Sequence, residues 1–249
     1  MKCAVVYKSL ELLEKVLSFL KIQGVSFELF SQPSSRLEEF DFIVSIGGDG
    51  TILSILQEVK KCPPIFGINT GRVGILTHSK PEDFETQLRR AIESFEVERF
   101  TRLSCICDSS EFLALNEVAF IGKERAKLIE VEIRVDFEEI DSLRCDGVIA
   151  STQIGSTAYA FSLGGPVIDP YLESIIITPI APFRFGWRPY VFRGDRIVEF
   201  KSRKGIAVID GKRFVETNKV TIKKSSFPAV FFKKEKRLKN LFYNIRRIE

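Results

Sequence analysis

The sequence has 249 residues, of which 45% are hydrophobic, and its 37 Lys and Arg against 33 Asp and Glu give a formal net charge of +4. This length and apolar content suit one large domain or two modest ones, and they exclude a disordered chain, a collagen or a coiled coil as the main architecture. The mild positive charge does not by itself favour nucleic-acid binding.

The first third of the chain alternates short apolar runs with segments of helical periodicity. Strands are expected at 2–7, 42–46 and 65–69, and helices at 10–20, 51–59 and 81–95. Strands that alternate with helices are typical of a parallel, doubly wound sheet. The sequence therefore predicts an α/β domain over residues 1–98.

The periodicity changes after residue 98. Apolar and charged residues alternate strictly over 129–137, which is typical of a strand with one solvent-exposed face. Further short strands are expected at 113–121, 147–151, 174–178, 190–192, 196–201, 205–209, 219–223 and 229–232. We therefore predict a β-rich domain over 99–232. A helix is expected at 237–247, within a tail, 233–249, that we expect to return to the first domain.

The five cysteines are odd in number and include no Cys-x-x-Cys pair, so the sequence supports neither a disulfide framework nor a zinc site. Reduced thiols are the simplest interpretation.

No apolar run approaches the about 20 residues of a membrane-spanning helix, and the N-terminus is unlike a signal peptide. The sequence therefore predicts a soluble, cytoplasmic protein with no membrane partner. The basic residues between 223 and 247 are interpreted as a solvent-exposed surface, with no nucleic-acid partner.

The segment Gly47-Gly48-Asp49-Gly50-Thr51 lies between a predicted strand and a predicted helix. Phosphate sites form there, because glycines admit a ligand close to the backbone and the helix N-terminus offers amide donors. A carboxylate in such a loop repels phosphate unless it holds a metal or accepts a proton, so Asp49 indicates phosphoryl transfer. The alternative is that Asp49 caps the helix.

A second glycine cluster, 67–74, follows the next strand, so two strand ends are expected to meet in one crevice, where ligands favour binding. The alternative is a loop whose glycines only turn the chain.

Farther along, Asn116 and Glu117 interrupt an apolar strand, where an unpaired polar group costs ~1 to 3 kcal/mol. The amide can pair with an adenine edge and the carboxylate with a ribose diol. The alternative is that both satisfy the local backbone.

Hydroxyl groups and an aromatic ring gather between glycines at Ser156, Thr157, Tyr159 and Ser162, which suits stacking and hydrogen bonding to a nucleotide. The single histidine, His78, has no matched nucleophile, so the sequence disfavours a Ser/His hydrolase. We expect His78 to lie on the surface.

In this order, the motifs resemble those of the NAD kinase family. The resemblance covers roughly 43–183 and rests on the segments 47–51, 67–77, 116–117, 146–147, 155–159, 164–166 and 178–182. It implies an N-terminal Rossmann-like α/β domain, a C-terminal β-sandwich-like domain, and self-association to a dimer or tetramer. The implied reaction transfers the terminal phosphoryl group of ATP, or of polyphosphate, to the 2′-hydroxyl of the adenosine ribose of NAD, with Mg²⁺ or another divalent metal, and gives NADP.

The resemblance also implies roles for individual residues. Asp49 is implied to accept the proton of the 2′-hydroxyl, Gly50 to help bind the substrate, and no side chain to ligate the metal. The phosphate loop consists of Gly47, Gly48, Gly50 and Thr51. Contacts to adenine and ribose are implied for Asn116 and Glu117, and contacts to the nicotinamide half or to a neighbouring subunit's ligand for Arg144 and Asp146. The other implied substrate contacts are Lys127, Thr157, Ala158, Tyr159, Ala160, Phe161 and Ser162.

Two alternatives remain beside this interpretation. A lipid kinase of the diacylglycerol or sphingosine type shares the Gly-Gly-Asp-Gly loop, but it requires a broad apolar entrance that 100–183 does not supply. A non-catalytic module that senses NAD or NADP gains nothing from a carboxylate beside the transferred phosphate. The sequence therefore favours an NAD kinase over both.

Overall fold

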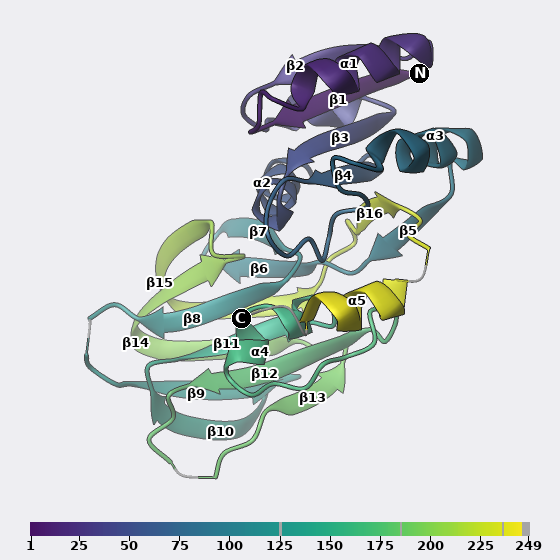
Figure 1. Cartoon of the computed structure of the whole chain (residues 1–249). Helices are drawn as coiled ribbons and strands as arrows, with labels where there is room; N and C mark the ends of the chain where they lie inside the picture. Colours follow the sequence, from purple (N-terminus) through teal and green to yellow (C-terminus); the bar gives the residue numbers. More distant parts are fainter. Residues whose placement is uncertain (125, 185, 236, 246–249) are drawn as a thin grey trace. The chain divides into compact units, whose positions relative to one another are not determined.

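The computed structural model describes residues 1–124, 126–184, 186–235 and 237–245 (Figure 1). The chain forms two compact units, which we number. Unit 1 joins Met1–Arg99 to the chain from Pro228 onward, and unit 2 is Phe100–Phe227. No helix in the described ranges is long and apolar enough to cross a membrane.

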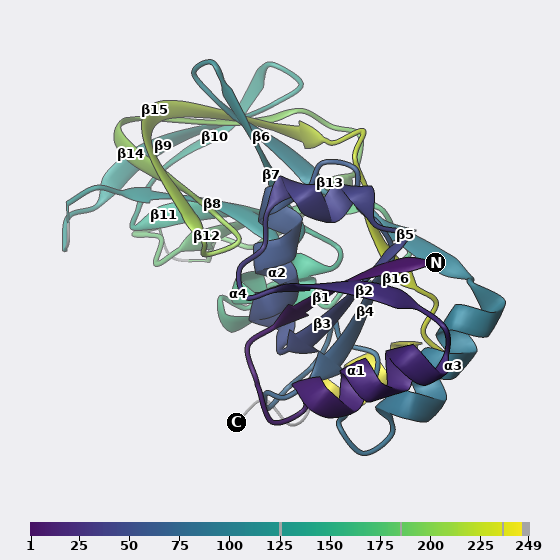
Figure 2. The ribbon, with the colours of Figure 1, turned by 90° about the horizontal axis from the view of Figure 1, so that it is seen from above.

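Unit 1 is a six-stranded sheet with helices on both faces. Its elements are β1 (Lys2–Tyr7), α1 (Leu13–Ile22), β2 (Ser26–Phe30), the 3₁₀ helix η1 (Ser35–Glu39), β3 (Phe42–Gly47), α2 (Asp49–Glu58), β4 (Ile65–Asn69), α3 (Phe84–Ser94), β5 (Val97–Phe100), β16 (Ala229–Phe232) and α5 (Arg237–Ile245). The strand order is β2-β1-β3-β4-β16-β5, and β1 to β4 pair in parallel. Helices α1 and α3 lie on one face and α2 on the other (Figure 2). The predicted Rossmann-like α/β domain is confirmed.

The two faces of this sheet bury different residues. Phe42, Val44 and Ile46 of β3 join the core formed with α1 and α3. Toward α2, a Cβ added to Gly67 would lie 2.8 Å from Cδ1 of Ile52 and 3.0 Å from Cα of Thr77, so glycine favours the close packing of α2 here. Since β2 and β3 flank β1, the chain reverses its winding direction between β1 and β3. Ligands bind at the carboxyl ends of strands beside such a switch point.

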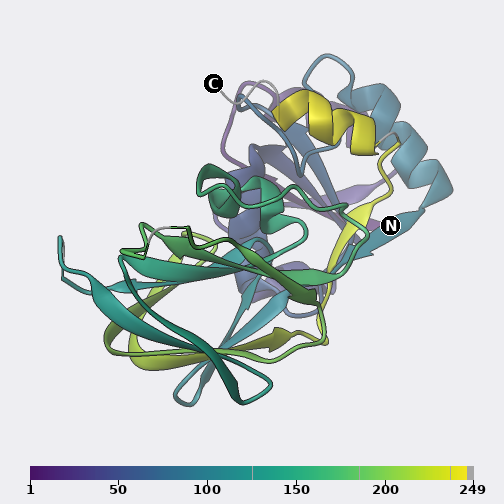
Figure 3. The same cartoon turned by 90° about the horizontal axis from the view of Figure 1, so that it is seen from below.

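Unit 2 is an antiparallel sheet folded around one core. Its elements are β6 (Leu103–Cys107), β7 (Ser110–Ala114), β8 (Glu117–Gly122), β9 (Ile129–Val135), β10 (Glu138–Cys145), β11 (Gly147–Thr152), the 3₁₀ helix η2 (Gly155–Thr157), α4 (Tyr159–Ser162), β12 (Ser174–Ile180), β13 (Tyr190–Arg193), β14 (Val198–Ile209) and β15 (Arg213–Lys224). The main strand order is β13-β12-β11-β8-β14-β15-β6-β7. Figure 3 shows these teal to green strands in two facing layers, with a shared apolar core contributed by most strands. The predicted β-sandwich-like domain is confirmed.

Several predicted boundaries differ from the observed ones. The strands expected at 196–201 and 205–209 are one strand, β14, whose register shifts between Lys201 and Gly205. A bulge of this kind interrupts the alternation that a sequence pattern follows. The predicted β-rich domain, 99–232, includes β16, which pairs in parallel with β4 through Phe231 and Ile65. The helix expected at 237–247 is present as α5, while 246–249 of the predicted tail lie outside the described residues.

Candidate functional site

Two glycine-rich loops lie side by side at the carboxyl ends of β3 and β4. The Thr70 amide donates to the Gly47 carbonyl at 3.3 Å. A Cβ added to Gly48 would lie 4.0 Å from Cα of Gly71, and the Gly71 amide donates to Oδ1 of Asn69 at 2.9 Å. The prediction that these two strand ends meet is confirmed. The first loop follows β3, which flanks the switch point of the sheet, and the second follows β4, the next strand.

Asp49 connects the two loops through its carboxylate. It is the first residue of α2, and the N-cap position is Gly48. The Ile75 amide donates to Oδ2 of Asp49 and the Leu76 amide donates to Oδ1, both at 2.9 Å. The alternative that Asp49 caps its own helix is therefore wrong, because the carboxylate binds the amides of the following loop.

The surroundings of Asp49 favour a carboxylate that can take up a proton. Burial raises the pKa of Asp49 above its ordinary value, while the Ile75 and Leu76 amides and the Lys234 ammonium partly lower it. A carboxylate oxygen has two acceptor positions, so one amide bond to each oxygen leaves capacity for a further donor. A raised pKa brings the group closer to neutral pH, where a general base works best.

The other phosphate-loop residues differ in how accessible they are. Gly50 is exposed and Gly48 is half-buried, so their backbone is open to a ligand. Thr51 is buried, its amide donates to the Gly48 carbonyl at 2.9 Å, and its hydroxyl occupies the space that a Cβ on Gly47 would need. Thr51 therefore supports the turn from inside.

In unit 2, the apolar strand expected at 113–121 is broken, since β7 ends at Ala114 and β8 begins at Glu117. The cause is Asp210, whose carboxylate accepts hydrogen bonds from the amides of Leu115 at 2.8 Å, Asn116 at 2.8 Å and Glu117 at 3.0 Å. Asp210 is not among the predicted site residues. The polar side chains of Asn116 and Glu117 do not point to it, because Asp210 binds the backbone amides of this segment.

Glu117 presents a carboxyl group that other described residues leave partly unsatisfied. Its Oε2 is buried, and no group in the described ranges donates to it. Burial, followed by the charge of Asp210, raises the pKa of Glu117 to about 8, while the Tyr159 amide lowers it. The carboxyl is therefore largely protonated at neutral pH and offers an O–H donor. Asn116 beside it is half-buried.

The segment 155–162 packs against Asn116. A Cβ added to Gly155 would overlap the Asn116 carbonyl, so glycine brings the segment close. The hydroxyls of Ser156 and Thr157 donate to backbone carbonyls three residues earlier, at 2.7 and 3.3 Å. The other residues of this segment that we predict to contact the substrate differ in their exposure. Ala160 is buried, Ala158 is half-buried, and Tyr159, Phe161 and Ser162 are exposed.

Asp146 lies at the opposite end of β8 from Glu117. Its carbonyl accepts a hydrogen bond from the Gly122 amide at 3.0 Å, whereas Ser151, at the other end of β11, pairs with Glu117. At about 3.3 Å per residue, the ends of β8 are roughly 16 Å apart. The structure therefore divides the predicted substrate contacts of unit 2 into two groups.

Arg144 and Lys127 belong with Asp146, and both are exposed. The Arg144 guanidinium lies 5.5 Å from the ring centroid of Phe183. Lys127 forms an ion pair with Glu124 at 2.5 Å. The structure does not bring these two residues to Asn116 and Glu117.

His78 is not the surface residue that the sequence predicts. Its Nδ1 accepts a hydrogen bond from the Gly67 amide at 3.0 Å, so Nε2 carries the proton and donates to the Phe232 carbonyl at 2.8 Å. Its ring stacks on Phe66 with centroids 4.9 Å apart. Burial lowers the pKa of His78 to about 3, so the ring is neutral and links its loop to β16.

Comparison with known proteins identifies similar chains over both units. A family model described as the ATP-NAD kinase N-terminal domain matches residues 14–96, and one described as the ATP-NAD kinase C-terminal domain matches residues 115–233. An NAD kinase from Archaeoglobus fulgidus is 58% identical over 249 residues and covers 100% of both chains. An NAD kinase from Methanothermobacter thermautotrophicus is 37% identical, covering 93% of this chain and 89% of the relative.

Solved structures agree with these matches. The crystal structure of an NAD kinase from Archaeoglobus fulgidus in complex with ATP has a TM-score of 0.98, with 58% identity and 100% of both chains covered. The structure of yeast NADH kinase complexed with NADH has a TM-score of 0.85 at 20% identity, covering 100% of this chain and 87% of that chain. The second comparison shows a shared fold.

Proposed function

The chain belongs to the NAD kinase family and is an NAD kinase, a phosphotransferase, and we propose that Asp49 accepts the proton of the hydroxyl that attacks the phosphoryl donor. One observation carries this assignment. The Asp49 carboxylate follows β3, beside the switch point of a parallel sheet, and two backbone amides of the loop after β4 orient it. Family membership favours this activity over the lipid kinase and the non-catalytic sensor.

The proposed mechanism depends on positioning and charge, as is general in phosphoryl transfer. The 2′-hydroxyl of the adenosine ribose of NAD attacks the terminal phosphorus of ATP, and Asp49 takes up its proton. The exposed backbone at Gly50 and the half-buried backbone at Gly48 suit an anionic phosphate, because they lie at the N-terminus of α2, where helix amides point toward a ligand. ATP as donor is supported by the relative from Archaeoglobus fulgidus that was solved with ATP. Polyphosphate as a second donor remains part of the proposal.

The proposed NAD contacts in unit 2 form two groups. Asn116 and Glu117 contact adenine and ribose, beside the segment 157–162 that lines the adenine site. The buried, unpartnered Oε2 of Glu117 supports this assignment, because a ribose hydroxyl would satisfy it. Arg144, Asp146 and Lys127 contact the nicotinamide half or the ligand of a second copy. Their separation from Glu117 along β8 supports a ligand longer than one nucleoside.

We propose Mg²⁺ or another divalent metal as the cofactor, bound through the donor phosphates. In the part of the chain that the structure describes, no three His, Cys, Asp or Glu side chains gather in a way that could hold a metal ion. The proposed ion therefore takes its ligands mainly from water and substrate phosphates, as Mg²⁺ commonly does. When bound, the ion neutralises phosphate charge.

A cytoplasmic location and self-association to a dimer or tetramer also belong to the proposal. None of the five cysteines, all within the described ranges, forms a disulfide, and four of them are buried, which supports a reducing compartment. The proposed contact of Arg144 and Asp146 with a second copy's ligand supports an oligomer.

The experiment compares Asp49→Asn with Asp83→Asn, whose carboxylate accepts a hydrogen bond from the Lys80 amide at 2.8 Å. We expect kcat of Asp49→Asn to fall by at least about 10²-fold, the usual effect of losing a general base. The dissociation constant for NAD, measured by calorimetry, should stay unchanged in both variants. Normal turnover by Asp49→Asn would contradict the assigned role, and a loss of NAD binding would indicate that Asp49 only holds the loop.

A further inference from the structure

The loop that binds Asp49 is hydrogen-bonded to the segment 232–234, which comprises the last residue of β16 and the two residues after it. Nζ of Lys234 donates to the Thr77 carbonyl at 2.7 Å, and Nε2 of His78 donates to the Phe232 carbonyl at 2.8 Å. Thr77 directly follows Leu76, whose amide donates to the Asp49 carboxylate. Two contacts therefore connect this segment to the loop on which the Asp49 carboxylate depends.

The segment that carries Lys234 is itself anchored on β5. The Lys234 amide donates to Oε1 of Glu98 at 3.3 Å, and Glu98 forms a buried ion pair with Arg237 at the start of α5. The Lys233 amide donates to the Glu96 carbonyl at 2.9 Å. The backbone amides of Lys233 and Lys234 are therefore both bonded, which restricts where the Lys234 ammonium can lie.

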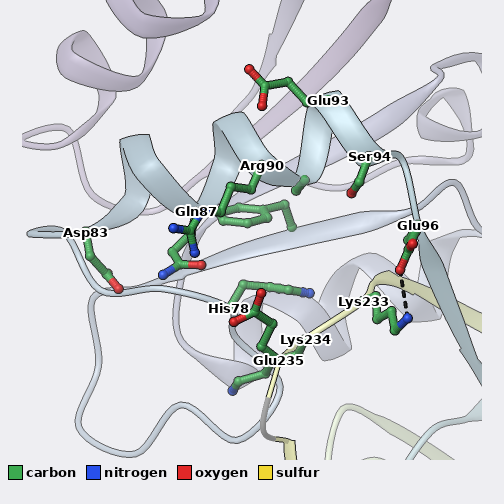
Figure 4. A pocket seen from close by; sticks show the side chains of 12 residues that line it. His78, Asp83, Gln87, Arg90, Glu93, Ser94, Glu96, Lys233, Lys234 and Glu235 are labelled. Atoms are coloured by element: carbon green, nitrogen blue, oxygen red, sulfur yellow. Dashed lines mark hydrogen bonds and ion pairs between the residues drawn. The ribbon is translucent and has the colours of Figure 1, made fainter.

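Lys234 and Lys233 differ sharply in environment. Lys234 is half-buried and lies, with His78 and Glu235, on the wall opposite α3 in a cavity of about 820 Å³ (Figure 4). The Lys233 side chain is 63% exposed and pairs with Glu96 at 2.7 Å. Burial, followed by the charge of Arg237, lowers the pKa of Lys234 to about 8, although the charges of Asp49 and Glu98 act to raise it. The same attraction lowers the pKa of Asp49.

We propose that Lys234 is a positioning residue for Asp49, because its hydrogen bond to Thr77 fixes the loop amides that orient the carboxylate and its charge favours the ionised form. This inference rests on the proposed role of Asp49. Lys234 acts through the loop and needs no contact with the substrate.

Other charged groups near Asp49 and Lys234 come from several elements. His78 is neutral above a pKa of about 3, and Glu98 and Arg237 pair with each other. The remaining charged residues that line the same cavity are Asp83, Arg90, Glu93, Glu96, Lys233 and Glu235. The charge of Lys234, whose own pKa is about 8, lowers the pKa of Asp49.

The test measures kcat and KM for NAD from pH 6 to 10, with melting temperatures, for Lys234→Met, Lys234→Arg and the matched control Lys233→Met. We expect kcat of Lys234→Met to fall by roughly 10- to 100-fold, an effect typical of a slightly misplaced reacting group, with KM unchanged. The acid limb of its kcat profile should move to higher pH, because Asp49 loses a stabilising positive charge. Lys234→Arg should restore kcat, and Lys233→Met should match the wild type.

The proposal is overturned if Lys234→Met keeps the wild-type kcat and acid limb, if kcat falls without movement of the acid limb, or if Lys233→Met shows an equal loss. If Lys234→Met does not fold, Lys234→Arg decides. Wild-type kcat should then fall above about pH 8 while the Arg variant keeps its activity, and coincident profiles overturn the proposal. Asp49→Asn is measured in parallel. Full activity of that variant overturns both proposals, whereas an inactive Asp49→Asn with an unaffected Lys234→Met overturns only the role of Lys234.

Discussion

At the scale of single residues, burial raises the pKa values of two carboxyl groups, Asp49 and Glu117, and their polar neighbours then act differently on each. Asp49 is half-buried and receives two amide hydrogen bonds and the field of Lys234, which favour its charged form. Glu117 is buried beside another carboxylate, Asp210, which disfavours its charged form. Asp49 therefore suits proton acceptance, and Glu117 suits hydrogen bonding as a neutral acid.

Glu117→Gln tests this difference through stability. Because the folded-state pKa of Glu117, about 8, lies above its ordinary value of 4.5, its contribution to stability is fully present below pH 4.5 and is lost as pH rises through 8. Glutamine has no charged form to bury. The variant should therefore gain stability over the wild type between pH 5 and pH 9, by up to a few kcal/mol, since one pKa unit corresponds to about 1.4 kcal/mol.

Urea unfolding at pH 5 and pH 9 measures this gain. Glu216→Gln is the control, because the Glu216 side chain is 65% exposed and pairs with Lys123 at the surface. A constant stability difference between Glu117→Gln and the wild type at both pH values would contradict the raised pKa.

At the scale of elements, the break between β7 and β8 shapes the proposed NAD contacts. Asp210 adopts a left-handed conformation with φ of 47° and binds three consecutive amides at this break. Asparagine tolerates that conformation but has only one acceptor oxygen. Asp210→Asn should therefore cost about 1 to 3 kcal/mol of stability, as expected when a buried donor loses its partner.

The same variant should raise KM for NAD more than it lowers kcat, because Asn116 and Glu117 lose their fixed backbone. Steady-state kinetics and thermal unfolding test both effects. Asp108→Asn is the matched control, since Asp108 also has a positive φ, 51°, but is exposed. Equal KM values for NAD and equal thermal stabilities in the two variants would contradict the role of Asp210 in holding Asn116 and Glu117.

Local sequence patterns predict the strands and helices of unit 1 better than they predict which strands pair with one another. The apolar runs of β1, β3 and β4 are buried on both faces, so they stand out in the sequence. The half-exposed strand β2 lacks that pattern and is not predicted. The assignment of β16 to the β-rich domain fails to anticipate its pairing with β4, because periodicity carries no information about distant partners.

The candidate site has the same limitation. Asp49 is found from its loop, but the amides that orient its carboxylate follow 26 and 27 residues later. Asp210 lies 94 residues from Asn116, and Lys234 lies 157 residues from Thr77. These contacts form only when the chain folds. The Gly-Gly-Asp-Gly motif therefore identifies Asp49 as the reacting group, but it does not identify the residues that orient Asp49.

At the scale of the whole molecule, each unit contributes a different part of the proposed reaction. Unit 1 contains the glycine loops, Asp49 and Lys234, and unit 2 contains Asn116, Glu117 and Asp210. The proposed reaction requires both sets of residues. Family models match both units, and the relative from Archaeoglobus fulgidus matches over the full chain.

The most direct test of the account is NADP formation by the purified protein from NAD, ATP and Mg²⁺, measured with a dehydrogenase that accepts only NADP. Asp49→Asn and a diacylglycerol substrate are tested in parallel. The account predicts that the wild type produces NADP, that Asp49→Asn produces almost none, and that diacylglycerol is not phosphorylated. Absence of NADP with the wild-type protein, or undiminished NADP formation by Asp49→Asn, would contradict it.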